Sequence, residues 1–162
     1  MYNCVDKNIF ILFQINDALF PIGAYSHSYG LETYIQKNLI KNSNDVYNLF
    51  KGKFDDKEQE YFYCLYLDNR KKLKKKKLLF IGTINYSVVH PREIFKEAYM
   101  IGAVSIIIIH NHPTGDVNPS HQDIETTKKI IEVGKLLGIK IDDHVIVGQN
   151  NYYSFFENGL FD

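Results

Sequence analysis

The sequence predicts an α/β fold in which a mostly buried sheet is flanked by two main helices. Residues 104–109 form a nearly continuous β-branched apolar run, which suits a strand covered on both faces. On each side of this run, apolar residues recur at helical spacing, so strands and helices alternate along the chain. The length of 162 residues fits one domain with a short appendage.

The first elements of this domain follow a polar cluster at residues 41–45. Asn44 or Asp45 is expected to cap a short helix that reaches Phe50. Residues 60–67 are rich in aromatic and β-favouring side chains, and they predict a buried strand.

A basic hairpin is expected next. Residues 68–70 predict a turn, and residues 78–81 predict the return strand. The run from Arg70 to Lys77 is almost entirely cationic. Lysines on an exposed edge strand hinder pairing with another sheet, which is the favoured interpretation of this run. The alternative is a weak contact with nucleic-acid phosphates.

Two longer helices are predicted in the second half of the chain. Pro91 opens the first, because its fixed φ suits the first helical position. The expected inner face of this helix consists of Phe95, Ala98, Tyr99 and Gly102. Ser120 is the expected N-cap of the second helix, and Gly138 marks its end. Its expected inner face consists of Ile124, Thr127, Ile131 and Gly134. Residues 144–147 and 152–156 predict a closing hairpin.

The composition excludes several classes of protein. Lys+Arg and Asp+Glu each number 19, which argues against a general nucleic-acid or membrane coat. No stretch reaches the ~18 consecutive apolar residues of a membrane span, and the start lacks a signal-peptide pattern. Cys4 and Cys64 are too few for a disulfide framework, so we expect reduced thiols in a cytoplasmic protein. The substrate and the oligomeric state are left open by the sequence.

Residues 110–123 contain a candidate metal site. His110 and His112 follow an apolar strand, and an extended backbone there would project both imidazoles to one side. Asp123 lies one turn into the next helix. Two imidazoles and one carboxylate form a three-ligand zinc set whose open position can hold a reactive water. The structural alternative is a capping box of Ser120 and Asp123 beside histidines that bond to the backbone.

The order of these residues matches a known motif. His110-x-His112-x7-Ser120-x2-Asp123 resembles the JAMM motif of the MPN+/JAB metalloprotease superfamily. Three segments in family order resemble the RadC family more closely, namely residues 90–95, 110–116 and 143–148. The likeness runs from about residue 43 to residue 162, and it implies an MPN (JAB)-like mixed sheet. Thr114 stands where the commoner family spelling has Ser.

The resemblance implies a role for each site residue. The ligands of Zn²⁺ would be His110, His112 and Asp123. Ser120 would donate a hydrogen bond to the oxyanion of a tetrahedral intermediate. Glu60 would act as general base and then general acid. Without the resemblance, Glu60 is a solvated charge at the start of a strand, and Glu58 competes with it for the role.

Four further polar residues near these motifs have structural interpretations. We expect Asp116 to order the loop and His121 to be exposed. His90 and His144 lie inside motifs of the family, where we expect them to form structural hydrogen bonds.

The resemblance implies a JAMM-type zinc metallopeptidase that hydrolyses an amide or isopeptide bond. The alternative from a different class is a catalytically silent MPN binding module associated with DNA repair. Residues 9–41 resemble the N-terminus of UreF, an all-helical urease accessory protein. This second likeness implies a short helical appendage and a remnant partner in urease maturation. We therefore predict a UreF-like fragment at residues 1–41 and a RadC-like MPN/JAMM domain at residues 42–162.

Overall fold

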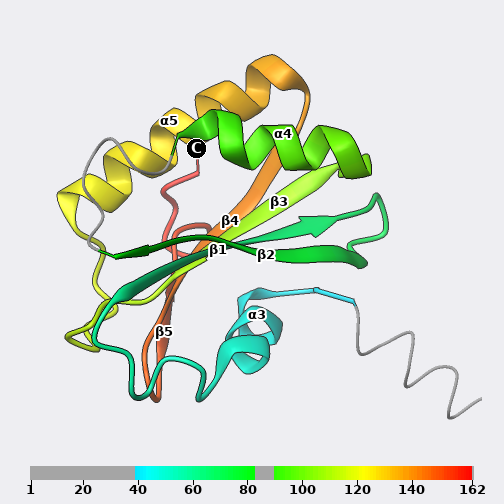
Figure 1. Ribbon diagram of the computed structural model, residues 1–162. Helices are drawn as coiled ribbons and strands as arrows, with labels where there is room; N and C mark the ends of the chain where they lie inside the picture. Colours follow the sequence, from blue (N-terminus) through cyan, green and yellow to red (C-terminus); the bar gives the residue numbers. More distant parts are fainter. Residues whose placement is uncertain (1–38, 83–89, 162) are drawn as a thin grey trace, which may run out of the picture. The chain divides into compact units, whose positions relative to one another are not determined.

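The computed structural model describes residues 39–82 and 90–161 of the chain (Figure 1). The chain divides into two units, residues 1–37 and residues 38–162, and every described residue belongs to the second. The UreF-like segment therefore lies almost wholly outside the described residues, and the boundary between residues 41 and 42 stays a prediction. Within the described ranges, no helix is both long enough and apolar enough to cross a membrane.

A five-stranded mixed sheet forms the centre of the second unit. Its strands are β1 (Glu60–Leu67), β2 (Leu73–Gly82), β3 (Ser105–His110), β4 (Lys140–Val147) and β5 (Tyr152–Ser154). The order across the sheet is β2-β1-β3-β4-β5. Strands β3 and β4 are parallel, and the other neighbouring pairs are antiparallel. This architecture confirms the predicted α/β class and its mixed sheet.

Helices cover both faces of the sheet. The helices of the described part are α3 (Ser43–Phe50), α4 (Pro91–Ile101) and α5 (His121–Leu137). Figure 1 shows α4 and α5 on one face and the short α3 on the other. Residues of β3 are buried along the whole strand, as the apolar run predicted, because both faces of this central strand are covered.

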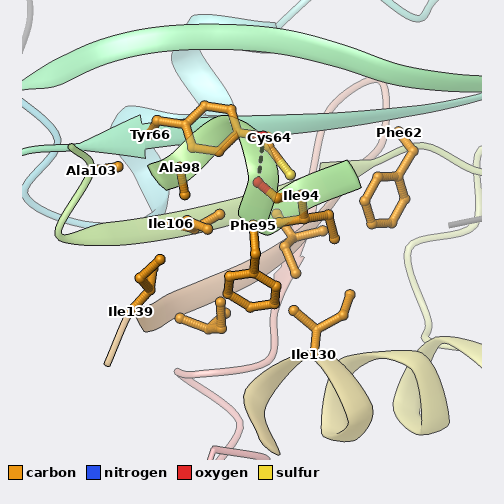
Figure 2. Packing of buried hydrophobic residues seen from close by; sticks show 12 residues of the cluster. Phe62, Cys64, Tyr66, Ile94, Phe95, Ala98, Ala103, Ile106, Ile130 and Ile139 are labelled. Carbon is orange, nitrogen blue, oxygen red and sulfur yellow. Dashed lines mark hydrogen bonds between the residues drawn. The ribbon is translucent and has the colours of Figure 1, made fainter. Parts of the chain in front are cut away.

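The core beneath α4 and α5 is built from alternate residues of the strands (Figure 2). Phe62, Cys64 and Tyr66 of β1 all point to this face, as the two-residue period of a strand requires. The Tyr66 hydroxyl donates to the Ile94 carbonyl at 3.2 Å, so its polar atom is satisfied inside the core. Burial raises the pKa of the Cys64 thiol, which keeps this cysteine protonated and unreactive.

The start of α3 differs from the prediction. The N-cap is Asn42, not Asn44 or Asp45. The Asn42 side chain accepts from the Asp45 backbone N–H at 2.9 Å, and the Asp45 carboxylate accepts from the Asn42 N–H at 3.3 Å. This reciprocal capping box satisfies two backbone donors at once, so the helix begins earlier than predicted.

The inner faces of α4 and α5 are also shifted from the predicted ones. On α4, Phe95 and Ala98 are buried as expected, but Tyr99 is 66% exposed. Ile94 is buried instead, so the face of α4 that packs on the sheet is rotated slightly from the predicted one. On α5, Ile130 is buried while the predicted Ile131 is only partly so.

Three strands differ in length from the prediction, and one of them, β5, ends at Ser154, two residues before the predicted end. β2 begins at Leu73 and therefore includes most of the basic run, whereas only residues 78–81 were predicted. It is an edge strand, as the favoured interpretation of the lysines expects. β4 begins at Lys140, four residues before the predicted start. Its first residues include Lys140, Asp142 and Asp143, so the hydrophobicity pattern did not predict them as a strand. The closing hairpin itself is confirmed by the antiparallel pairing of β4 with β5.

Candidate metal centre

The end of β3 and the start of α5 bring three candidate ligands together. His110, His112 and Asp123 each offer one ligand atom, and these atoms lie within 4.8 Å of one another. The two Nε2 atoms of His110 and His112 are 3.1 Å apart. The carboxylate of Asp123 lies 3.3 Å from each of these nitrogens. The predicted strand–loop–helix spacing therefore does produce one compact cluster, which could hold a metal ion.

A chain of buried hydrogen bonds fixes the orientation of the His110 ring. The Thr127 hydroxyl donates to the Asp123 carbonyl at 2.5 Å, and its oxygen lies 2.6 Å from Nδ1 of His144. Because the hydroxyl proton is already used, this oxygen accepts from His144 Nδ1–H. Burial, and then the charge of His110, hold the pKa of His144 well below its usual value, so this ring is neutral.

The same chain determines which nitrogen of His110 carries a proton. Nε2 of neutral His144 is an acceptor, and it lies 2.8 Å from Nδ1 of His110. His110 therefore donates from Nδ1 and directs the lone pair of Nε2 at the cluster. His112 has its own support, because its Nδ1 lies 2.7 Å from the Asp116 carbonyl and donates to it. Its Nε2 likewise carries a lone pair that faces Asp123.

The donor set passes a simple chemical test for a metal. Two ring nitrogens and a carboxylate, all presenting lone pairs to one point, repel one another unless a cation lies between them. Imidazole nitrogen and carboxylate oxygen are ligands of divalent transition metals, and a three-ligand set leaves a coordination position open.

The electrostatics of the metal-free cluster agree with this test. Burial opposes the ionisation of Asp123, but hydrogen bonds from His110 and His112 outweigh it and hold the pKa of the carboxyl well below its usual range. The hydrogen bond to Asp123 raises the pKa of His112, against the effect of burial. A proton on His112 therefore takes the place of the cation when no metal is present.

Asp123 is placed both as a candidate metal ligand and as part of a helix capping box, the two alternatives that the sequence left open. It is the third residue of α5, and its Oδ2 accepts from the Ser120 backbone N–H at 2.7 Å. The Ser120 hydroxyl accepts from the Asp123 N–H at 3.1 Å, which completes a capping box. The same carboxylate faces both histidines. Ser120 itself is exposed at the rim of the cluster.

Glu60 begins β1 beside the cluster. Phe62 of β1 pairs with His110, so continuing the antiparallel register places Glu60 opposite His112. After the hydrogen bond to Asp123, the charge of Glu60 is among the causes that raise the pKa of His112, which puts its carboxylate within electrostatic reach. Glu58 precedes the strand and is exposed.

Other polar residues of the motifs have structural roles. Asp116 orders the loop as predicted, because its Oδ1 accepts from both the backbone and the side chain of Asn118. His121 is exposed. His90 caps α4, where its Nδ1 accepts from the Arg92 N–H at 3.1 Å.

Two residues support the cluster in a way that the sequence did not predict. His144 forms the structural hydrogen bonds that were expected of it, but one of them is to His110, and Thr127 was predicted to line the inner face of a helix. Their contact with the candidate ligand His110 depends on the parallel pairing of β3 with β4, in which Ile108 lies opposite His144. The one signal in the sequence was a histidine directly before the apolar run of residues 145–147.

The lysine run is divided by strand alternation. Lys75 and Lys77 point towards α4, where both bind the Glu97 carboxylate at 2.6 Å. These two hydrogen bonds lower the pKa of Glu97 to about 2. Lys76 points to the other face, with its Nζ 5.2 Å from the centre of the Phe50 ring. These cations therefore take part in the fold, and a contact with nucleic acid stays a prediction.

Comparison with known proteins places this site in a family context. The family described as RadC-like JAB domain matches residues 40–160. A UPF0758 protein of Methanosarcina mazei is 45% identical over 132 residues, which cover 80% of this chain and 58% of the relative. A UPF0758 protein of Bacillus cereus is 42% identical over 126 residues, with coverages of 78% and 56%. One of Staphylococcus haemolyticus is 45% identical over 127 residues, with the same coverages. The chain thus spans less than two thirds of the length of these relatives.

Proposed function

The chain belongs to the family of RadC-like JAB domains, and from this premise we propose that it is a zinc-dependent metallohydrolase that cleaves an amide or isopeptide bond. The observation that carries the proposal is the convergence of His110, His112 and Asp123 on one point. These three residues would hold Zn²⁺ and leave one position open. A bound zinc ion supplies an acidified water and a Lewis acid for the carbonyl of the substrate.

Glu60 is the proposed general base and general acid. It would take the proton from the attacking water and later give it to the leaving amine. Side chains at every second strand position share one face, so Glu60 and Phe62 point to the face that α5 covers. Asp123 approaches from that same helix. Glu58 lacks this placement because it lies outside the strand.

Ser120 is the proposed donor to the oxyanion. Its hydroxyl donates to Oδ2 of Asp123 at 2.6 Å. Rotation of the hydroxyl about the Cβ–Oγ bond would turn this proton towards a substrate oxygen at the exposed rim. Oδ2 of Asp123 would still accept from the Ser120 backbone N–H, so the helix keeps part of its cap.

A small cavity next to the cluster is the proposed place for part of a peptide or protein substrate. Its volume is about 130 Å³, and His112 lines it together with Phe54 and Thr114. Such a volume accommodates a short side chain and not a large ring system. We further propose a cytoplasmic location, where the buried free thiol of Cys64 stays reduced.

The experiment that tests this proposal is hydrolysis by the zinc-loaded chain. Fluorogenic peptides and isopeptide-linked conjugates are incubated with the wild type, with Glu60→Gln and with Glu58→Gln. We expect cleavage by the wild type and by Glu58→Gln, and a rate lower by ~10²- to 10⁴-fold in Glu60→Gln. Equal rates in the wild type and Glu60→Gln would overturn the assignment. Bound zinc without any cleavage would favour the alternative, a catalytically silent MPN binding module.

A further inference from the structure

Asn111 lies between the two candidate histidine ligands, but its side chain is bonded to β1. The residue is 1% exposed. Its Oδ1 accepts from the Tyr61 backbone N–H at 2.8 Å, and its Nδ2 donates to the Gln59 carbonyl at 3.1 Å. These two backbone groups belong to the residues on either side of Glu60. The Asn111 amide therefore brackets Glu60.

This pair of bonds extends the β1–β3 ladder beyond the end of β3. Phe62 and His110 are the last paired residues, so the next position of β1, Tyr61, would face Asn111. The backbone of Asn111 no longer pairs there, and its side-chain amide supplies the missing donor and acceptor. A planar group with one acceptor and two N–H donors can replace a peptide unit in this way. A carboxylate offers only acceptors, and an alkyl side chain offers neither.

The two hydrogen bonds of the Asn111 amide, called the bracket below, bear on the placement of Glu60 more directly than on that of the candidate ligands. His110 is held by His144, and His112 by the Asp116 carbonyl, so each ring has its own support. Glu60 is the first residue of β1, a position where strands tend to fray, and it pairs with Gly82 of β2 on the side away from β3. Asn111 supplies bonds on both sides of that residue.

We propose that Asn111 is a positioning residue that holds Glu60 at a fixed place relative to His112. The inference rests on the proposed function, because it concerns the glutamate assigned there as general base. A general base works only within hydrogen-bond reach of the proton that it takes, and a displacement of ~1 Å can lower a rate by ~10²-fold. The single amide of Asn111 thus links the metal-binding loop to the strand that carries the base.

The test compares Asn111→Leu and Asn111→Asp with the wild type. Leucine has a similar volume and removes both bonds, whereas aspartate keeps the acceptor for Tyr61 and loses the donor to Gln59. Asn158→Leu is the control, since the Asn158 amide also donates to a backbone carbonyl but does so near the end of the chain. If Asn111→Leu does not fold, Asn111→Asp carries the test.

The first measurement is amide hydrogen exchange at Tyr61 by NMR, together with zinc content by mass spectrometry. We expect exchange at Tyr61 to be faster by ~10-fold in Asn111→Leu, as the loss of one hydrogen bond implies, and to change less in Asn111→Asp. About one zinc per chain should remain in both variants. Unchanged exchange at Tyr61 in Asn111→Leu would overturn the bracket. Loss of zinc from Asn111→Asp would overturn the assignment to Glu60, because Asn111 would then support the ligands.

The second measurement is the pH dependence of the visible spectrum of the Co²⁺-loaded chain. A carboxylate beside the open coordination position disfavours deprotonation of the bound water, so Glu60→Gln should lower the midpoint. We expect Asn111→Leu to lower the midpoint in the same direction and to add nothing in the double variant with Glu60→Gln. An additive effect would overturn the inference. A wild type that binds no metal would instead contradict the proposed function, while the exchange at Tyr61 would still test the bracket.

Discussion

Replacing Thr127 with valine should weaken Zn²⁺ binding by ~10- to 100-fold, although Thr127 is not itself a candidate ligand. Valine has a similar shape but removes the oxygen that accepts from His144 Nδ1–H at 2.6 Å. Without this acceptor, the proton of the neutral His144 ring moves to Nε2. It then faces Nδ1 of His110 across 2.8 Å and forces the proton of His110 onto Nε2. That nitrogen is the one directed at Asp123, so a proton blocks the metal.

The magnitude follows from the cost of leaving the His144 N–H unpaired. If His144 kept its tautomer, a buried N–H would lack an acceptor at a cost of ~1–3 kcal/mol, so the metal-free chain adopts the changed tautomers instead. Metal binding must reverse the change and restore that unpaired N–H. Since ~1.4 kcal/mol corresponds to tenfold in affinity, this cost predicts a loss within the stated range. Thr126→Val is the matched control, because Thr126 is the neighbouring residue of α5 and takes no part in the chain of bonds.

The affinity is measured by competition with a chromophoric zinc chelator at pH 7.5. The tautomers of both histidines are measured separately by long-range nitrogen–proton NMR correlations on the metal-free chain. We expect Thr126→Val to match the wild type in both experiments. The reasoning is refuted if Thr127→Val binds Zn²⁺ as tightly as the wild type, or if the proton of His110 stays on Nδ1.

Four further predictions concern pH and packing. Zn²⁺ affinity should fall as the pH decreases, because protonated His112, whose pKa is raised by its bond to Asp123, cannot bind a metal. Competition titrations between pH 5.5 and pH 7.5 measure this affinity, and a flat profile would count against the prediction. The metal-free chain should in turn lose stability as the pH rises above 6.5 through that raised pKa, which thermal unfolding at several pH values reports. Acidification from pH 4.5 towards about 2 should destabilise Glu97→Gln less than the wild type, because the ionised Glu97 stabilises the fold only above its lowered pKa. Unfolding free energies that fall in parallel with pH in the two proteins would contradict this. Gly134→Ala should destabilise the fold by ~1–3 kcal/mol in urea unfolding, since a Cβ would lie 2.6 Å from the Ile139 carbonyl oxygen, and an unchanged midpoint would show that the backbone yields easily.

The elements that depend on local patterns were predictable from the sequence. The apolar run of β3 and the caps of α5 at Ser120 and Gly138 act through neighbouring residues, so their signals are local. The full length of β2 was not predicted, because its lysines gave an edge-strand signal without marking where the strand begins. Lys75 and Lys77 are accommodated in the strand by Glu97, a residue of α4 that only the fold brings beside them.

The candidate site shows the same division. The spacing of His110, His112 and Asp123 predicted a cluster, because all three lie within one strand–loop–helix segment. The residues that orient this segment come from other strands. His144 is 34 positions from His110, and Asn111 meets β1 through a register that no local pattern contains. Long-range strand pairing therefore decides which polar residues support the site.

The most direct test of this account is the zinc content of the purified chain, measured by inductively coupled plasma mass spectrometry beside His112→Ala. The account predicts about one zinc per wild-type chain and its loss from the variant, with circular dichroism showing that both are folded. Absence of zinc from the wild type after reconstitution, or equal zinc in the variant, would contradict it. The histidines and Asp123 would then have only the strand-end and capping roles that their hydrogen bonds also permit.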